Sequence, residues 1–211
     1  HGSHRPTPSL EHPRAYPHGV SSPEMPIDES TVGEDPYAVV ARWWDAAKAA
    51  TGDIERSSPM SVASVDAEGR PSVRVVLLRG LDERGFVFYT NYDGRKGREL
   101  PPGAPGAIAI HWPDLGAQVR AEGVVERVGA EESDAYFAAR PRGHRIGAWV
   151  SPQSEVIPDR GFLEAREREF TERFEGAEVP RPEHWGGIRL VPRVIEVWGN
   201  RHDRIHDRFR F

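Results

Sequence analysis

A dozen residues near the end of the sequence, Trp198 to Phe209, combine aromatic, imidazole and guanidinium side chains in a segment whose pattern predicts a strand. Side chains alternate between the two faces of a strand, so one face would carry His202, Arg204, His206 and Arg208. A face made only of donors and cations suits an anion, and guanidinium planes can also lie against a planar ring. The same pattern is typical of charged edge strands, which discourage pairing between sheets. This segment alone leaves both a binding face and a solvated edge open.

Other cations lie where predicted strands meet turns. Arg74 stands in an otherwise apolar run, where an unpaired buried charge is too costly, so it must meet an anion or point outward. An internal carboxylate is the ordinary partner for such an arginine. The stretch DGRKG at 93–97 can begin a short helix, whose N-terminal amides would hold a phosphate together with Arg95 and Lys96. It is not a Walker loop, because the Gly-x4-Gly-Lys-Ser/Thr spacing is absent.

A phenol and a guanidinium come together at Tyr136 and Arg140, which are four residues apart and share one face of a predicted helix. Such a pair can grip a phosphate monoester, but by itself the spacing favours a surface cation–aromatic contact. His202 and His206 raise the question of a metal. No third ligand with supporting carboxylate spacing is evident, so we predict no metal site.

Length, charge and composition restrict the class of protein. The 211 residues suit one domain with a sizeable core, and a net charge of -5 makes nucleic acid a poor partner. No apolar stretch approaches the roughly 20 residues of a membrane-spanning helix. The absence of cysteine excludes a disulfide, a thiolate nucleophile and a cysteine-based metal site. We therefore expect a cytoplasmic protein without a membrane partner.

The polar, proline-rich start of the chain predicts an arm. The opening HGSH is typical of an expression tag, and residues 1–34 show no periodicity, which predicts a tag remnant and a flexible N-terminal arm. Order is expected to begin at Asp35-Pro36, an N-cap followed by a proline at the first helical position. Residues 35–211 would then form a single domain.

Hydrophobic periodicity predicts more strands than helices. The expected helices cover residues 36–50, 131–139 and 160–174. The expected strands cover residues 60–66, 72–78, 86–90, 107–112, 118–128 and 188–198, with one more at the end of the chain. Strands at such short spacing favour an antiparallel barrel, and the helices interrupt the sheet without a βαβ rhythm. The fold class is therefore α+β, mainly β, and a Rossmann cofactor site is not expected.

Taken together, these segments resemble one known family. They are RVVLLRG at 74–80, VFYTN at 87–91, RK at 95–96, QV at 118–119, YF at 136–137, RPR at 140–142, IGAWVS at 146–151, QS at 153–154, WGG at 185–187 and RIHDR at 204–208. In this order and spacing they strongly resemble the pyridoxamine 5'-phosphate oxidase family, from about Asp35 to the end. The resemblance implies an FMN-binding split β-barrel of Greek-key type with peripheral helices, and a homodimer with FMN at the subunit interface.

The resemblance also implies which residues bind FMN. Arg74, Arg95 and Lys96 would serve the flavin phosphate. The remaining FMN contacts would come from Val75, Val76, Leu77, Leu78, Tyr89, Thr90, Gln118, Gln153, Ser154, Trp198 and Arg208. In this interpretation the phosphate is the counterion that the cations in apolar strands require.

For the substrate, the resemblance implies Tyr136 and Arg140 at the phosphate, with Arg204 and His206 as catalytic residues beside the pyridine ring. The implied chemistry is hydride transfer from C4' of pyridoxine or pyridoxamine 5'-phosphate to the flavin. Reoxidation of the flavin by O2 then gives H2O2, and the other product is pyridoxal 5'-phosphate. Arg14 and Tyr16 in the arm are candidates for a lid over this site.

Two substrate-site residues depart from the family pattern. Arg79 replaces the usual lysine and His144 replaces the usual serine, and both still donate hydrogen bonds to an anion. The Trp198-Gly199-Asn200 turn is similar to that of related flavin oxidases of phenazine biosynthesis. Two alternatives therefore stand beside a vitamin B6 oxidase. One is a phenazine-type oxidase of a secondary metabolite, and the other is a non-catalytic FMN or pyridoxal-phosphate binding protein.

Overall fold

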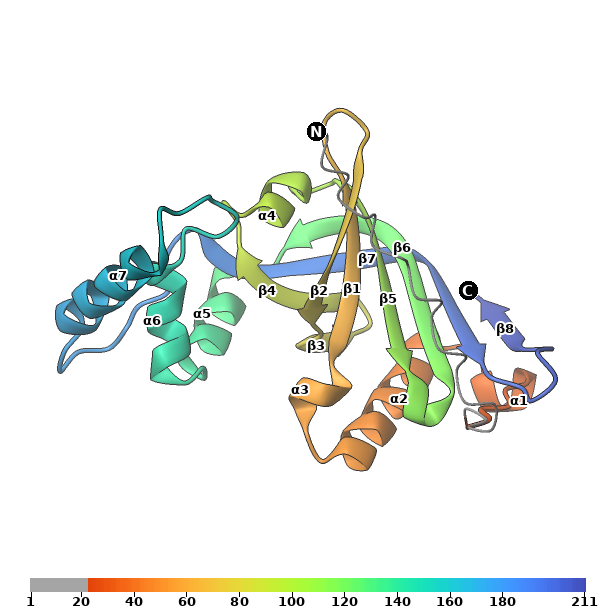
Figure 1. Cartoon of the computed structure of the whole chain (residues 1–211). Helices are drawn as coiled ribbons and strands as arrows, with labels where there is room; N and C mark the ends of the chain where they lie inside the picture. The colour runs from red at the N-terminus through yellow and green to blue at the C-terminus, as the bar shows by residue number, and fades with distance from the viewer. Residues whose placement is uncertain (1–22) are drawn as a thin grey trace, which may run out of the picture.

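A single curved antiparallel sheet forms the centre of the protein, whose computed structural model describes residues 23–211 (Figure 1). The strands run in the order β2-β1-β5-β6-β7-β4-β3, and β8 pairs with β7. Their bounds are β1 Pro59–Val65, β2 Pro71–Leu77, β3 Gly80–Asp82, β4 Gly85–Asn91, β5 Pro105–Trp112, β6 Ala117–Arg127, β7 Trp185–Gly199 and β8 Asp207–Arg210. The predicted antiparallel, mainly β fold is confirmed.

Helices cover both ends of the sheet. Their bounds are α1 Glu29–Val32, α2 Pro36–Thr51, α3 Ile54–Ser57, α4 Arg95–Glu99, α5 Ala130–Ala138, α6 Arg142–Val150 and α7 Arg160–Arg173, with a 3-10 turn at Pro113–Leu115. As predicted, α2 begins at Pro36, and the Asp35 side chain caps it by accepting from the Tyr37 N–H. None of the helices in residues 23–211 is long and apolar enough to cross a membrane.

The apolar side chains form two clusters. The larger one lies under the sheet and includes Met60, Phe86 and Phe88, against which the Trp43 face of α2 packs. The smaller one joins α5, α6 and α7 around Phe137, and the first residue of β7, Trp185, belongs to it. Figure 1 shows α5–α7 gathered at one end of β7 and β8 at the other, so this strand crosses the whole molecule. The two ends of β7 therefore lie in different surroundings.

The predicted start of order was too late. Ile27 and Val32, within the stretch expected to be a flexible arm, are only 5% and 3% exposed and belong to the core. The Met25 N–H also donates to the Asn200 carbonyl. Single apolar residues in a polar stretch give no periodicity, which is why the pattern missed them. Arg14 and Tyr16, the candidates for a lid, lie outside the described residues.

The predicted C-terminal strand was wrong in its first half. After β7 ends at Gly199, residues 200–206 form a turn, and only Asp207–Arg210 pair as β8. His202, Arg204 and His206 therefore do not share a strand face with Arg208. Local hydrogen bonds compete with the strand here, because the His206 Nδ1 accepts from the Arg201 N–H and the Asp207 carboxylate accepts from the Arg201 Nε.

Candidate active site

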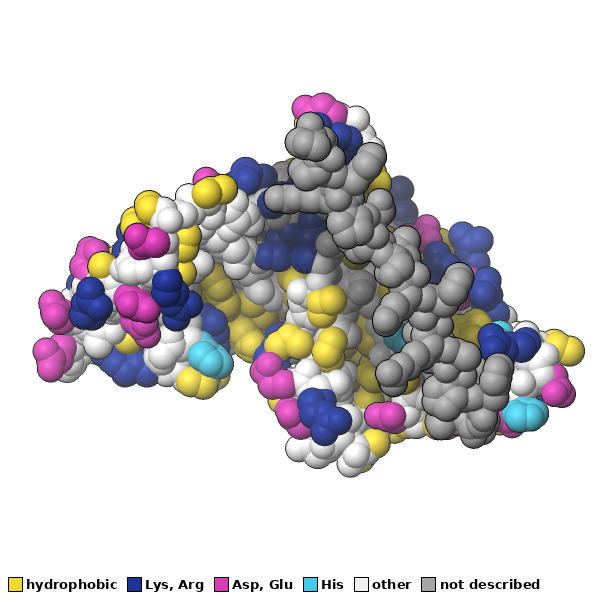
Figure 2. Space-filling view, viewed as in Figure 1, with side chains coloured by type: hydrophobic (Ala, Val, Ile, Leu, Met, Phe, Trp, Pro, Cys, Tyr) yellow, Lys and Arg dark blue, Asp and Glu magenta, His cyan; other side chains and the backbone are white. Residues whose placement is uncertain are grey.

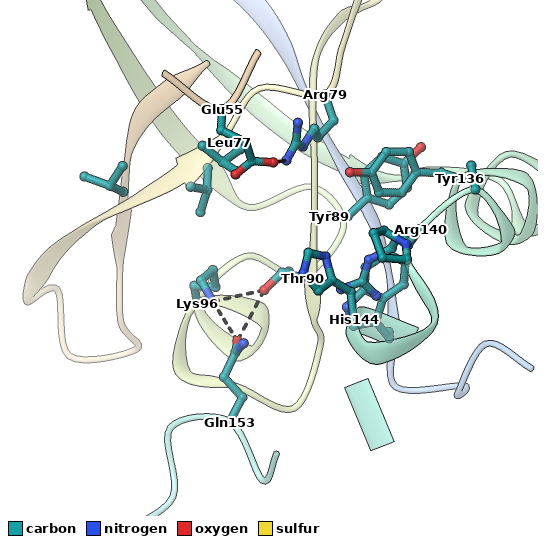
Figure 3. A pocket seen from close by; sticks show the side chains of 15 residues that line it. Glu55, Leu77, Arg79, Tyr89, Thr90, Lys96, Tyr136, Arg140, His144 and Gln153 are labelled. Carbon is teal, nitrogen blue, oxygen red and sulfur yellow. Dashed lines mark hydrogen bonds and ion pairs between the residues drawn. The ribbon is translucent and has the colours of Figure 1, made fainter. Parts of the chain in front are cut away.

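A cavity of about 560 Å³ opens between α3 and β2 on one side and α5 and α6 on the other (Figure 3). Many of the predicted site residues line it: Val75, Val76, Leu77, Arg79, Tyr89, Thr90, Lys96, Tyr136, Arg140, His144 and Gln153. The prediction missed Glu55, Ala139, Pro141 and Trp185. Figure 2 shows this side of the molecule hollowed next to the α5–α7 lobe, with dark blue Lys and Arg side chains in the hollow.

One corner of the cavity is built around Lys96. Its Nζ donates to Thr90 Oγ1 at 3.0 Å and to Gln153 Oε1 at 2.6 Å, which are both neutral acceptors. The short helix α4 begins here as predicted, and the Arg95 N–H donates to Ser154 Oγ at 3.0 Å. Burial, with a smaller contribution from the charge of Arg74, lowers the pKa of Lys96. Because its contacts within the described residues include no carboxylate, this corner suits an anion.

Arg74 does not line the cavity, because an internal carboxylate holds it behind the wall. Its Nη2 lies 2.7 Å from Glu99 Oε2, and its Nη1 donates to Ser64 Oγ at 2.6 Å. Arg95 Nε reaches the other oxygen of Glu99 at 2.6 Å. The sequence had left this internal partner open as the ordinary alternative to a phosphate. The i,i+4 spacing on α4 could have paired Glu99 with Arg95, but it gave no signal for the contact with Arg74.

Glu99 predicts a dependence of stability on pH. Burial alone would raise the pKa of this carboxyl, but hydrogen bonds from Ser64, Ser72, Arg95 and Arg74 outweigh it and lower the pKa to about 2. A lowered pKa in the folded state means that the ionised network stabilises the fold above the ordinary pKa of 4.5. We expect that stabilisation to be lost as the pH falls from about 4.5 towards 2.

The melting temperatures of the wild type and Glu99→Gln, measured between pH 2 and 7, test this expectation. Glutamine keeps an acceptor oxygen for Arg74 and removes the charge. The difference between the two proteins should be largest above pH 5 and should shrink below pH 4. Parallel curves over the whole range would show that the Glu99 charge does not contribute to stability in this window.

The opposite wall of the cavity is aromatic. Tyr89 and Tyr136 stack with ring centroids 3.8 Å apart, and Trp185 continues the stack at 5.5 Å from Tyr89. Gly187 leaves room beside the Tyr89 ring, since a Cβ there would lie 2.6 Å from the Val128 side chain and 3.0 Å from that ring. Burial, aided by nearby negative charge, raises the pKa of Tyr89 to about 12, so its phenol stays protonated at neutral pH. The wall is therefore flat, neutral and suited to a planar ring.

Arg140 lies against this wall with spare donors. Its guanidinium carbon is 4.5 Å from the Trp185 ring centroid, and its buried Nη1 has no hydrogen-bond partner within the described residues. Burial lowers its pKa, and the charge of Arg79 acts in the same direction. Helix α5 ends at Ala138, yet Tyr136 and Arg140 still meet at the cavity as predicted. A half-buried guanidinium whose buried Nη1 is an unused donor fits an anion.

The remaining predicted residues lie elsewhere. Leu78 is fully buried in the core and gives its backbone N–H to the Ser58 carbonyl, so it does not line the cavity. At the far end of β7, Trp198 pairs in register with Gln118 on β6 and with Arg208 on β8. The His206 ring lies 4.6 Å from the Trp198 ring, and Arg204 stands in the same turn. A second group, which we call the Trp198 cluster, therefore consists of Gln118, Trp198, Arg204, His206 and Arg208.

The Trp198 cluster is far from the cavity in the same chain. Trp185 lines the cavity and Trp198 lies thirteen residues further along β7, which corresponds to about 40 Å of extended strand. Backbone geometry also marks both places. Ser154, next to the Lys96 corner, and Arg204, in the Trp198 cluster, have φ of 72° and 62°, and no other non-glycine residue among those described has a positive φ. Such uncommon conformations concentrate at functional sites.

Comparison with known protein families accounts for most of the chain. Residues 46–173 match the model described as pyridoxamine 5'-phosphate oxidase. Residues 185–211 match the model of the pyridoxine 5'-phosphate oxidase C-terminal dimerisation region. The first match ends near the last residue of α7, and the second covers β7, the turn and β8.

Individual relatives agree with these matches. A pyridoxine/pyridoxamine 5'-phosphate oxidase of Burkholderia multivorans is 52% identical over 182 residues, which cover 86% of this chain and 84% of that protein. An oxidase of the same name from Cupriavidus necator is 49% identical over 185 residues, or 88% of this chain and 86% of that protein.

Solved structures show the same fold. PhzG from Burkholderia lata, crystallised with tetrahydrophenazine-1-carboxylic acid, superposes with a TM-score of 0.81 at 29% identity and covers 90% of this chain and 93% of its own. A pyridoxamine 5'-phosphate oxidase-related, FMN binding protein of Nostoc punctiforme, 14% identical, covers 85% of this chain and 98% of its own and has a TM-score of 0.58. From the family matches and the relatives near 50% identity we conclude that the chain belongs to the pyridoxamine 5'-phosphate oxidase family of oxidoreductases.

Proposed function

We propose that this chain is an FMN-dependent oxidase that converts pyridoxine 5'-phosphate and pyridoxamine 5'-phosphate to pyridoxal 5'-phosphate, with O2 as electron acceptor and H2O2 as product. The observation that carries the proposal is a cavity with two separate cationic corners and a flat aromatic wall. FMN and the substrate each combine one phosphate with one planar ring. The cavity offers a place for each phosphate.

The Lys96 corner fits the phosphate of FMN. The Lys96 ammonium is half-buried, and its contacts with Thr90 and Gln153 are neutral. The Arg95–Ser154 hydrogen bond adds further polar groups at the start of α4. Val75, Val76 and Leu77 would support the ring system along β2. When bound, FMN supplies the hydride acceptor and the reaction with O2. The role of the chain is to hold the cofactor and to align the substrate against it.

The second corner fits the phosphate of the substrate. Arg140 offers its unused Nη1, and Tyr136, Arg79 and His144 line the same part of the cavity. Arg204 and His206 would hold the pyridine ring near the reacting carbon, and they belong to the Trp198 cluster. Since that cluster lies at the other end of β7, the proposed site requires a second copy of the chain to supply it.

A symmetric homodimer meets this requirement. In the dimer that we propose, the cavity of one chain faces the Trp198 cluster of its partner, and two-fold symmetry makes the same contact occur twice. Val73 and Val75 beside the cavity are 69% and 66% exposed in the single chain, as expected for apolar residues that a subunit interface would bury. The match of residues 185–211 to a dimerisation region supports the same arrangement.

Aerobic turnover of pyridoxine 5'-phosphate by the FMN-loaded protein tests the proposed function. We expect pyridoxal 5'-phosphate and hydrogen peroxide to form in equal amounts. The protein without FMN, and the loaded protein without O2, are the controls. If FMN is bound and can be reduced but no aldehyde forms, the proposal is wrong, and a binding protein or another substrate takes its place.

One observation favours a second candidate, a phenazine-type flavin oxidase. A further cavity of about 310 Å³, lined along α6 by Gly143, Gly147 and Ala148, shares Arg140, His144, Gln153 and Trp185 with the first. The combined space would admit a larger tricyclic substrate, and PhzG, which was crystallised with a tetrahydrophenazine, has the same fold. Comparing kcat/KM for tetrahydrophenazine-1-carboxylic acid and pyridoxine 5'-phosphate distinguishes the two candidates.

A further inference from the structure

Glu55 is an acidic residue in a cavity that is otherwise cationic. It lies in the four-residue helix α3, where the Asp53 side chain accepts from its backbone N–H at 2.8 Å. Among the described residues that line the cavity it alone is acidic, whereas Arg79, Lys96 and Arg140 are cations. Its carboxylate is paired with the Arg79 guanidinium, and Figure 3 shows the two side chains pointing toward each other.

The two partners of this ion pair are unequally held. The Arg79 side chain is 17% exposed, whereas the Glu55 side chain is 60% exposed. An exposed carboxylate on a short helix can turn towards solvent at little cost, whereas Arg79 is enclosed by the cavity. The pair can therefore open by movement of Glu55 while Arg79 keeps its place.

Arg79 belongs to the corner proposed for the substrate phosphate. Arg140, with its unused Nη1, lies close enough to feel the charge of Arg79, and an anion between them would satisfy both guanidiniums. The Glu55 carboxylate pairs with one of these two cations, Arg79. Carboxylate and phosphate oxygens both accept hydrogen bonds from the guanidinium fork, so they compete for it.

We propose that Glu55 is a specificity-determining residue that competes with the substrate phosphate for Arg79 and is displaced when a phosphorylated ligand binds. This inference rests on the proposed function. Glu55 would weaken the binding of every ligand that places a phosphate at Arg79, including the product. Ligands without a phosphate would leave the ion pair closed.

The test is Glu55→Gln, which removes the competing charge and keeps the size of the side chain. For the FMN-loaded protein we expect KM for pyridoxine 5'-phosphate and the inhibition constants of inorganic phosphate and pyridoxal 5'-phosphate to fall about two- to fivefold, the range for opening an exposed ion pair. The effect on KM should exceed the effect on kcat. It should diminish at high ionic strength, because salt screens the pair in the wild type.

Two controls accompany the variant. Pyridoxal, which lacks the phosphate, should inhibit the wild type and Glu55→Gln equally. Glu68→Gln removes a carboxylate of similar exposure, 64%, that is also paired with an arginine but lies in the turn between β1 and β2. It should leave all the constants at wild-type values.

The outcomes separate this inference from the proposed function. Unchanged inhibition by phosphate and pyridoxal 5'-phosphate in Glu55→Gln, with turnover intact, overturns the competition alone. Weaker binding of these ligands also overturns it, because Glu55 would then hold Arg79 in place for the phosphate. If the wild type does not oxidise pyridoxine 5'-phosphate, direct titration with pyridoxal 5'-phosphate and phosphate still tests the competition, and tighter binding by the variant supports it.

Discussion

Replacing Lys96 with methionine is expected to weaken FMN binding by about 2 kcal/mol, or roughly 30-fold in Kd. Methionine keeps most of the length of the side chain and removes the ammonium. Among residues 23–211 the partners of that ammonium are Thr90 and Gln153, which are both neutral. The loss therefore falls on the proposed contact with phosphate, and no carboxylate of the described residues is left unpaired. Titration of the FMN-free protein, followed by the quenching of flavin fluorescence, measures the Kd.

Arg98→Met is the matched control for this prediction. Arg98 lies on the same helix, α4, but it is exposed and contacts the Asp93 carbonyl and Glu155. We expect its Kd for FMN to stay within about twofold of the wild type, because surface ion pairs contribute little. Equal affinities of Lys96→Met and the wild type would place the flavin phosphate away from this corner.

Replacing Arg204 with asparagine is expected to lower kcat/KM for pyridoxine 5'-phosphate about 100-fold while one FMN per chain is retained. Arg204 has a positive φ, which asparagine tolerates better than most residues, so the change removes the guanidinium without adding backbone strain. Loss of a group that orients the reacting carbon commonly has an effect of this size. His202→Ala, an exposed change in the same turn, should keep its activity.

Mixing subunits shows whether Arg204 acts in the cavity of the partner. Arg140→Ala damages the cavity and Arg204→Asn damages the Trp198 cluster, so homodimers of either variant should be nearly inactive. When the two are coexpressed with different tags, each mixed dimer contains one intact composite site and one doubly damaged site. Random mixing should restore about a quarter of the wild-type activity. No recovery in purified mixed dimers would mean that both residues serve the same chain.

Much of the fold was predictable from the sequence because its strands are strongly patterned. Strands β1, β2, β4, β5 and β6 begin and end within two residues of their predicted bounds, and α2 begins at the predicted cap. Helix α6 was missed as a separate element. Its residues Arg142–Val150 include two glycines and a tryptophan, and the proline at 141 interrupts the pattern of α5.

The sequence predicted many residues of the candidate site but not the residues with which they form ion pairs. The pattern identified Arg74 as a cation needing an anion, yet Glu99 could be assigned to it only once β1, β2 and α4 were placed together. Glu55 gave no signal, because a lone glutamate in a short polar segment has many ordinary uses. The separation of the cavity from the Trp198 cluster could not be predicted either. The order of motifs along the sequence does not tell how far apart they lie in the folded chain.

The bulge in β7 has a consequence for the proposed dimeric site. Between the cavity and the Trp198 cluster, Glu122 pairs with Val194 and Gly123 with Pro192, so Arg193 is an extra residue in β7. Bulges bend a strand and increase its twist, and proline is tolerated there because a ladder hydrogen bond is already lost. This one inserted residue sets the angle between the two ends of the strand. Selectivity in such an assembly can therefore change through the bend of a backbone, without any exchange of the side chains that touch the ligand.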